Sequence, residues 1–114
     1  MTFNNNKAIY LQMADRLCDD ILADKYGAND RIPSVREYAV TLGVNSNTAV
    51  KAYEELGVIY NRRGLGYFVA ADAKEQIMQA RRTTFFREVL PEMFRQMRLL
   101  GIDIKDVNEK WAEP

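Results

Sequence analysis

Apolar residues recur every three or four positions through residues 8–25, the spacing that gathers them on one face of an α-helix. These positions are Ile9, Tyr10, Met13, Ala14, Leu17, Cys18, Ile21 and Leu22. We therefore expect an amphipathic helix that buries this face. A loop follows over residues 26–33, in which Gly27 can end the helix and Asn29 tolerates a left-handed backbone.

Two short helices joined by a tight turn are predicted over residues 34–56. Ser34 and Glu37 have the Ser-x-x-Glu spacing of a capping box, in which each side chain accepts a hydrogen bond from the other residue's backbone N–H. Gly43 permits the positive φ that ends the first helix. Asn45 can cap the second helix. The face that this second helix is expected to bury consists of Ala49, Ala52, Tyr53 and Leu56.

The order of residue types around this turn is also informative. A small residue, Ala39, is followed after three residues by Gly43, the apolar Val44 and the polar cap Asn45. This pattern is typical of a DNA-binding helix-turn-helix, whose second helix enters the major groove. A generic pair of packed helices is the alternative for this segment alone.

After the second helix the pattern changes to two short runs with strand character. Residues 57–60 and 66–70 are predicted strands, and the turn between them contains Arg62, Arg63 and Gly64. An isolated hairpin is marginally stable in water, so this one should dock on the helices. A hairpin with two arginines at its tip, directly after a helix-turn-helix, predicts a winged helix.

Helical spacing of apolar residues continues through residues 71–114. Pro91 removes one backbone donor and should kink or divide this helix near Val89 and Leu90. Gly101 is expected to end the helix, and Asp103 to cap a last one.

The apolar stripe of this tail is too wide for a lone helix, which must bury it against another surface. We expect that surface to be a second copy of the chain, since a dimer suits two DNA half-sites. Folding of the tail onto its own winged helix and a ligand cleft are the alternatives. The residues expected to form the dimer contact are Phe85, Phe86, Val89, Met93, Phe94 and Met97.

Charge changes this picture only locally. The 114 residues include 16 basic and 16 acidic ones, so the whole chain gives no electrostatic argument for nucleic acid. Over residues 31–66, however, basic residues outnumber acidic ones. The acidic ones are Glu37, Glu54 and Glu55. The basic ones are Arg31, Arg36, Lys51, Arg62 and Arg63.

Composition argues against several classes of protein. One cysteine and no histidine disfavour a disulfide framework, a zinc site and histidine-based catalysis. There is no P-loop and no dinucleotide-binding glycine motif. We expect no enzyme activity, cofactor or metal. No apolar run approaches the ~18 residues of a membrane span and the N-terminus lacks a signal-peptide core, so a cytoplasmic protein that does not bind membranes is expected.

Five motifs occur in order along the chain and are specific in combination. They are Tyr10-Leu11-Gln12-Met13-Ala14-Asp15-Arg16-Leu17, Asp30-Arg31-Ile32-Pro33-Ser34-Val35-Arg36-Glu37, Gly43-Val44, Asn47-Thr48 and Arg63-Gly64-Leu65-Gly66-Tyr67-Phe68-Val69. With these motifs the chain resembles the GntR family of bacterial transcription regulators, and its tail is similar to that of the short YtrA-type subgroup.

The resemblance implies a mainly helical fold with a small β-hairpin: a winged helix-turn-helix over residues 1–70 and a helical dimerisation tail over residues 71–114. It implies a sequence-specific repressor that binds a pseudo-palindromic site on double-stranded DNA as a homodimer. The residues after Ala70 are too few to enclose a ligand pocket of roughly 300–1,000 Å³, so no small-molecule effector is expected. A winged helix that binds another protein instead of DNA is the alternative function.

The family's contact positions can be assigned one by one. Arg36 matches an arginine that reaches bases or phosphates, Asn47 and Thr48 match recognition-helix positions, and Arg63 and Gly64 match the tip of the wing. The full set expected to face DNA is Ser34, Arg36, Asn45, Ser46, Asn47, Thr48, Lys51, Arg62, Arg63 and Gly64.

The chain departs from the family at three points. Ser46 and Val50 stand where relatives carry arginine, which weakens the case for arginine readout of guanine there. Val50 could instead contact a thymine methyl or belong partly to the core. At Leu56-Gly57, relatives have a few more residues before the first wing strand. Either the recognition helix is shorter here, or the sequence lacks these residues.

Overall fold

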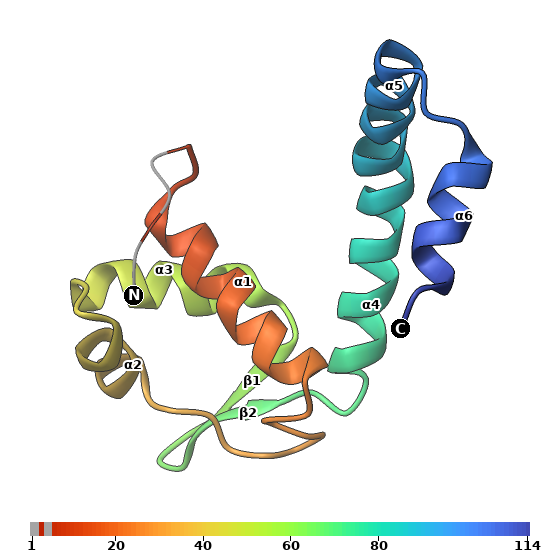
Figure 1. Cartoon of the computed structure of the whole chain (residues 1–114). Helices are drawn as coiled ribbons and strands as arrows, with labels where there is room; N and C mark the ends of the chain where they lie inside the picture. The colour runs from red at the N-terminus through yellow and green to blue at the C-terminus, as the bar shows by residue number, and fades with distance from the viewer. Residues whose placement is uncertain (1–2, 4–5) are drawn as a thin grey trace. The chain divides into compact units, whose positions relative to one another are not determined.

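The computed structural model describes residue 3 and residues 6–114. They form two compact units: the first extends to Met78, and the second is Gln79–Pro114 (Figure 1). The prediction of a mainly helical protein with one hairpin is confirmed. In chain order the elements are α1 (Ile9–Leu22), α2 (Val35–Leu42), α3 (Ser46–Leu56), β1 (Ile59–Arg62), β2 (Gly66–Val69), α4 (Ala73–Thr84), the π-helical turn η1 (Phe85–Val89), α5 (Leu90–Leu100) and α6 (Ile104–Ala112).

Helix α1 buries the predicted apolar face, with Met13, Leu17 and Ile21 almost fully enclosed. It ends at Leu22, three residues earlier than expected. The expectation that Gly27 ends the helix is wrong, because Asp24 already takes a left-handed backbone conformation with φ 63°. Aspartate tolerates this conformation better than most residues do, since its short side chain can form local hydrogen bonds.

The caps of α2 and α3 are confirmed. The Ser34 hydroxyl accepts the Glu37 N–H at 3.1 Å, and the Glu37 carboxylate accepts the Ser34 N–H at 3.3 Å. These hydrogen bonds with Ser34 lower the pKa of Glu37. Gly43 ends α2 with φ 67°, and the Asn45 side chain accepts the Asn47 N–H at 2.8 Å.

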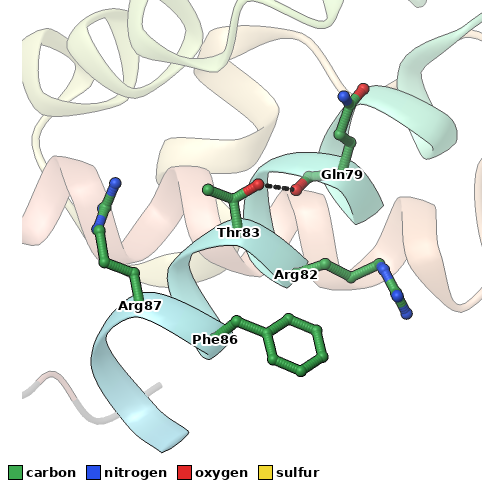
Figure 2. A pocket seen from close by; sticks show the side chains of 5 residues that line it. All are labelled: Gln79, Arg82, Thr83, Phe86 and Arg87. Atoms are coloured by element: carbon green, nitrogen blue, oxygen red, sulfur yellow. Dashed lines mark hydrogen bonds between the residues drawn. The ribbon is translucent and has the colours of Figure 1, made fainter. Parts of the chain in front are cut away.

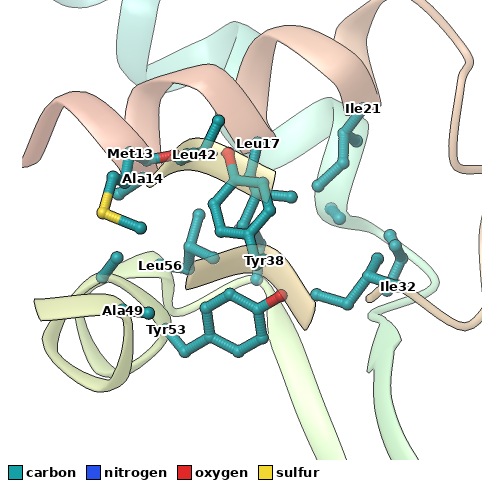
Figure 3. Close-up of a cluster of buried hydrophobic side chains, with 14 of the residues drawn as sticks. Met13, Ala14, Leu17, Ile21, Ile32, Tyr38, Leu42, Ala49, Tyr53 and Leu56 are labelled. Atoms are coloured by element: carbon teal, nitrogen blue, oxygen red, sulfur yellow. Dashed lines mark hydrogen bonds between the residues drawn. The ribbon is translucent and has the colours of Figure 1, made fainter. Parts of the chain in front are cut away.

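The core of the first unit lies where α1, α2 and α3 meet (Figure 3). Two tyrosines bring hydroxyl groups into it, and both are satisfied by backbone carbonyls. Tyr38 donates to Met13 at 3.3 Å, and Tyr53 donates to Pro33. Hydrogen bonding of both hydroxyls removes the cost of burying them in an apolar core.

The wing is an antiparallel pair of strands in which Ile59 faces Val69 and Arg62 faces Gly66. Strand β1 begins two residues later than expected, at Ile59, and Arg62 belongs to this strand instead of the turn. The reason is that Gly57 ends α3 with φ 65° and the next residue, Val58, is buried in the core. Only after Val58 can the chain run extended.

The segment before α2 is a loop, as predicted, and it also pairs with the free edge of β2 through an isolated bridge at Arg31. The Asn29 N–H donates to the Val69 carbonyl at 2.8 Å, and the Val69 N–H donates to Asp30 at 2.9 Å. The Ile32 N–H donates to the Tyr67 carbonyl at 3.0 Å. Strand β2 is therefore hydrogen-bonded on both sides, which anchors the hairpin to the helical core.

Helix α4 begins in the first unit, where Ala73 and Ile77 are buried in the core. The division between folded domains at residues 70/71 stays a prediction. In the second unit the regular α-helix is interrupted before Pro91: η1 precedes α5, and the Leu90 N–H donates to the carbonyl of Phe85, five residues back. The wider turn gives the proline ring room, because in a regular helix the ring clashes with the carbonyl four residues earlier.

The predicted end of one helix at Gly101 and the predicted cap of the next at Asp103 are confirmed. Gly101 ends α5 with φ 67°, and Asp103 and Asp106 form a reciprocal capping box at the start of α6. Among the described residues, no helix combines the length and the apolarity that crossing a membrane requires.

The buried tyrosine gives the fold a testable pH dependence. Burial raises the pKa of Tyr38 from its ordinary value near 10 to about 12. Its contribution to stability is therefore complete below pH ~10 and is lost as the pH rises towards 12, by roughly 2–3 kcal/mol in total. Urea unfolding of wild type and Tyr38→Phe at pH 8, 10 and 11.5 should show a steeper fall in the free energy of unfolding for wild type. If the free energy of unfolding falls equally with pH in both proteins, the raised pKa of Tyr38 is contradicted.

Candidate nucleic-acid interface

The outward face of α3 carries the polar residues expected to meet DNA. Ser46, Asn47 and Lys51 are exposed, and Thr48 is half-buried. The opposite face, with Ala49 and the other three predicted core residues of the helix, is buried. Because one face is held in the core, the polar side chains of α3 have a fixed direction towards solvent.

Two residues of the predicted contact set already serve the helices themselves. The Ser34 hydroxyl and the Asn45 side-chain oxygen each accept a backbone N–H at a helix start. Asn45 is exposed and Ser34 is half-buried. Their first role is to set where α2 and α3 begin, and thereby which residues those helices present.

Arg36 lies in the first turn of α2 and is exposed. Its side chain makes no ion pair with any residue that the structure describes. The exposed backbone N–H groups at a helix start also attract anions. A cationic side chain at this place is well suited to a phosphate.

Lys51 has a neighbour that the sequence did not reveal. Its ammonium nitrogen lies 5.8 Å from the centroid of the Tyr10 ring, a cation–π contact with α1. Lys51 thus leans towards α1 and stands at one edge of the exposed face of α3. The sequence placed Tyr10 only in the apolar face of α1.

The wing presents Arg62 from the end of β1 and Arg63 and Gly64 from the turn, all exposed. The Arg62 guanidinium lies 5.6 Å from the centroid of the Phe68 ring, and Phe68 stacks on Tyr60 at 5.7 Å. This aromatic support orients Arg62 while its charge stays exposed to solvent. Gly64 adopts φ 79°, a conformation that side chains disfavour.

Arg31 is a further basic residue at the wing, outside the set expected to face DNA. It bridges to Phe68 of β2 in backbone pairing, and its side chain crosses Gly66. A Cβ added at Gly66 would lie 3.1 Å from the Arg31 Nε, and Gly66 has φ 113°. The positive φ favours a glycine there, and the Arg31 side chain packs close against it. The sequence shows the positive charge of Arg31. It does not show that Arg31 pairs with Phe68, because the two residues lie far apart in the chain.

The tail residues expected to form a dimer contact fall into two groups. Phe85, Phe86 and Val89 of η1 are 45%, 55% and 51% exposed. Met93 and Phe94 are half-buried, and Met97 is 9% exposed, packed within its own chain. Of the six predicted contact residues, the three on η1 are thus the ones exposed to a partner, and Met97 contributes little.

A shallow groove of about 540 Å³ runs beside α4 and η1 (Figure 2). The Arg82 guanidinium lies 5.8 Å from the Phe86 ring, and the Thr83 hydroxyl donates to the Gln79 carbonyl at 3.0 Å. The lining residues are spaced as neighbours on one helix face, so the groove is an open surface instead of an enclosed cavity. They are Gln79, Arg82, Thr83, Phe86 and Arg87.

Within residues 3 and 6–114, no group of three or more metal-ligating side chains is placed to hold an ion. The site therefore consists of cationic and hydrogen-bonding side chains on α2, α3 and the wing. Such a set can bind a polyanion and read base edges, but it provides no nucleophile–base pair for catalysis.

Comparisons with known proteins agree with this geometry. Residues 9–69 match the family model for bacterial regulatory proteins of the gntR family. The chain is 36% identical over 110 residues to the HTH-type transcriptional regulator YhcF of Bacillus subtilis, covering 94% of this chain and 89% of that protein. It is 30% identical over 104 residues to the HTH-type transcriptional repressor YtrA of the same organism, covering 89% and 79%.

A solved structure is also similar. The crystal structure of a transcriptional regulator of the GntR family from Bacteroides thetaiotaomicron has a TM-score of 0.75 and 50% sequence identity, covering 90% of this chain and 93% of that one. The similarity extends past the winged helix into the tail.

The cap of α3 can be separated from its DNA-facing neighbour by substitution. Asn45→Ala should lower the free energy of unfolding by about 1 kcal/mol, because the Asn47 N–H loses its acceptor. Ser46→Ala, one residue along and exposed, should change it by less than about 0.5 kcal/mol. Urea unfolding of both variants measures this. Equal effects would show that Asn45 is not the effective cap.

Proposed function

Since this chain belongs to the GntR family of bacterial regulatory proteins, we propose that it represses transcription as a cytoplasmic homodimer, with α3 in the major groove of each half-site. Like its relatives, it is a DNA-binding transcription regulator and not an enzyme. The alternative of a winged helix that binds only protein is disfavoured by this membership.

The observation that carries the proposal is the two-sided character of α3. Its alanine-lined face is buried, and its N-terminal polar residues are exposed beside the equally exposed Arg36. A helix held in this way can be inserted into the major groove without unfolding its own core. In this arrangement Asn47 and Thr48 meet base edges and backbone, while Arg36 contacts a phosphate or a base.

The wing supplies a second contact. Arg62 and Arg63 are exposed at the end of the hairpin, and Gly64 carries no side chain that would keep the backbone away from DNA. We assign these residues to the neighbouring phosphate backbone or the minor groove. Arg31, at the base of the same hairpin, adds a positive charge on that side.

Two copies are needed because one copy has no net positive charge. The whole chain has a formal net charge of zero, so a single winged helix has only local attraction for DNA. Phe85, Phe86 and Val89 offer an exposed apolar surface on η1 that a second chain can bury. A two-fold dimer then matches a pseudo-palindromic operator. The repressor assignment draws support from the name of the YtrA relative.

Loss of the cationic contacts should weaken DNA binding. Arg36→Ala and the double variant Arg62→Ala/Arg63→Ala should each bind the DNA upstream of the gene less tightly at physiological salt. The slope of log K against log salt should fall by roughly 0.9 for each phosphate contact removed in each subunit. Electrophoretic mobility shift or fluorescence anisotropy titrations between 50 and 200 mM salt measure both quantities.

Lys105→Ala is the matched control for this experiment. Lys105 lies on α6, outside the proposed interface, and the variant loses one positive charge, as Arg36→Ala does. It should bind like wild type. The proposed contacts are wrong if the arginine variants also retain wild-type affinity and slope.

The dimer is tested by removing the aromatic surface of η1. Phe85→Ala/Phe86→Ala should shift the protein to a single chain in analytical ultracentrifugation at micromolar concentration and weaken binding to a full operator more than to a half-site. Leu99→Ala/Leu100→Ala removes exposed apolar surface of the same unit outside the proposed contact and should remain dimeric. A wild-type protein that sediments as one chain would refute the homodimer.

A further inference from the structure

Glu54 is an exposed residue of α3 that has no role in the contacts proposed so far. Asn47, Val50, Lys51 and Glu54 are all exposed, and their spacing of three, four and seven residues places them on one face of the helix. This face lies opposite the buried one. If α3 enters the major groove, Glu54 enters with it.

Glu54 is not neutralised within its own chain. Its carboxylate has no ion pair or hydrogen bond with the residues described by the structure. Its nearest basic neighbour in sequence, Lys51, leans away towards the Tyr10 ring on α1. The carboxylate is therefore free to accept a hydrogen bond from outside the molecule.

DNA offers a carboxylate few favourable partners. Phosphates repel it, and most groups at the floor of the major groove are acceptors themselves. The donors there are the amino groups of cytosine and adenine, and a carboxylate pairs best with cytosine N4, because adenine presents an acceptor beside its amino group. A glutamate on the groove-facing side of a recognition helix is consistent with base selection and not with general affinity.

We propose that Glu54 determines sequence specificity by accepting a hydrogen bond from a cytosine amino group in each half-site; this inference rests on the proposed insertion of α3 into the major groove. Seven residues along a helix correspond to about 10 Å, or roughly three base-pair steps. The cytosine therefore lies within about three base pairs of the base that Asn47 contacts.

The test is selection of binding sites from a library of random duplex DNA by wild type, Glu54→Gln and Glu55→Gln. Wild type should enrich a pseudo-palindrome with cytosine at one position of each half-site. In Glu54→Gln the preference for that cytosine should fall by roughly 5- to 100-fold, the usual range for one specific base contact. Adenine should replace it in part, since glutamine pairs with adenine. The other positions should be unchanged.

Glu55→Gln is the matched control because Glu55 is also exposed on α3 but lies about 100° further round the helix. Both variants lose one negative charge, so both gain the same sequence-independent attraction for DNA. Only Glu54→Gln should alter the selected base. Circular dichroism and urea unfolding confirm that both variants are folded.

The remaining outcomes separate the two proposals. If all three proteins select the same site, Glu54 does not read a base, while the proposed function stands. The same conclusion follows if Glu54→Gln loses affinity for every sequence equally. If wild type enriches no sequence at all, the proposed function fails and this inference fails with it.

Discussion

Burial of the small-residue face of α3 is the interaction on which the rest of the first unit depends. Ala49 and Ala52 are fully enclosed, and Ala39 of α2 nearly so. Their short side chains let the helices approach closely, and close-packed interiors accept little change in volume. The same contact that stabilises the fold also determines which side chains of α3 remain outside. Stability and the proposed DNA recognition therefore depend on opposite faces of a single helix.

Tyr53 connects this helix to the wing. Its hydroxyl donates to the Pro33 carbonyl, and its ring meets Tyr67 of β2 edge to face with centroids 5.1 Å apart. Burial raises the pKa of Tyr53, so the hydroxyl stays protonated and continues to donate. The segment before α2, helix α3 and strand β2 are thus held by one side chain. This gives the exposed face of α3 and the wing a fixed separation, which the proposed recognition of a rigid duplex requires.

The tail differs from the first unit because few of its apolar residues are buried. Pro91 cannot fit a regular helix with its preceding turn, and the chain widens into η1. The residues of that turn, Phe85 and Phe86, lie with their rings 5.7 Å apart and remain exposed. An exposed aromatic pair is costly in water unless a partner covers it. This cost is the physical reason for proposing a dimer.

The sequence by itself determined the features that depend on neighbours three or four residues apart. The capping boxes at Ser34 and Asp103, the turn at Gly43 and the break near Pro91 follow from local hydrogen bonds and sterics. The exposed polar set on α3 followed from periodicity. Other features were decided by contacts between residues distant in the chain. They are the pairing of residues 29–32 with β2, the cation–π contact of Lys51 with Tyr10, the contact of the Arg31 side chain with Gly66 and the burial of Met97. A local pattern records which face of a segment is apolar, but it does not record which distant backbone or ring will meet that face. Only the assembled structure supplies that partner.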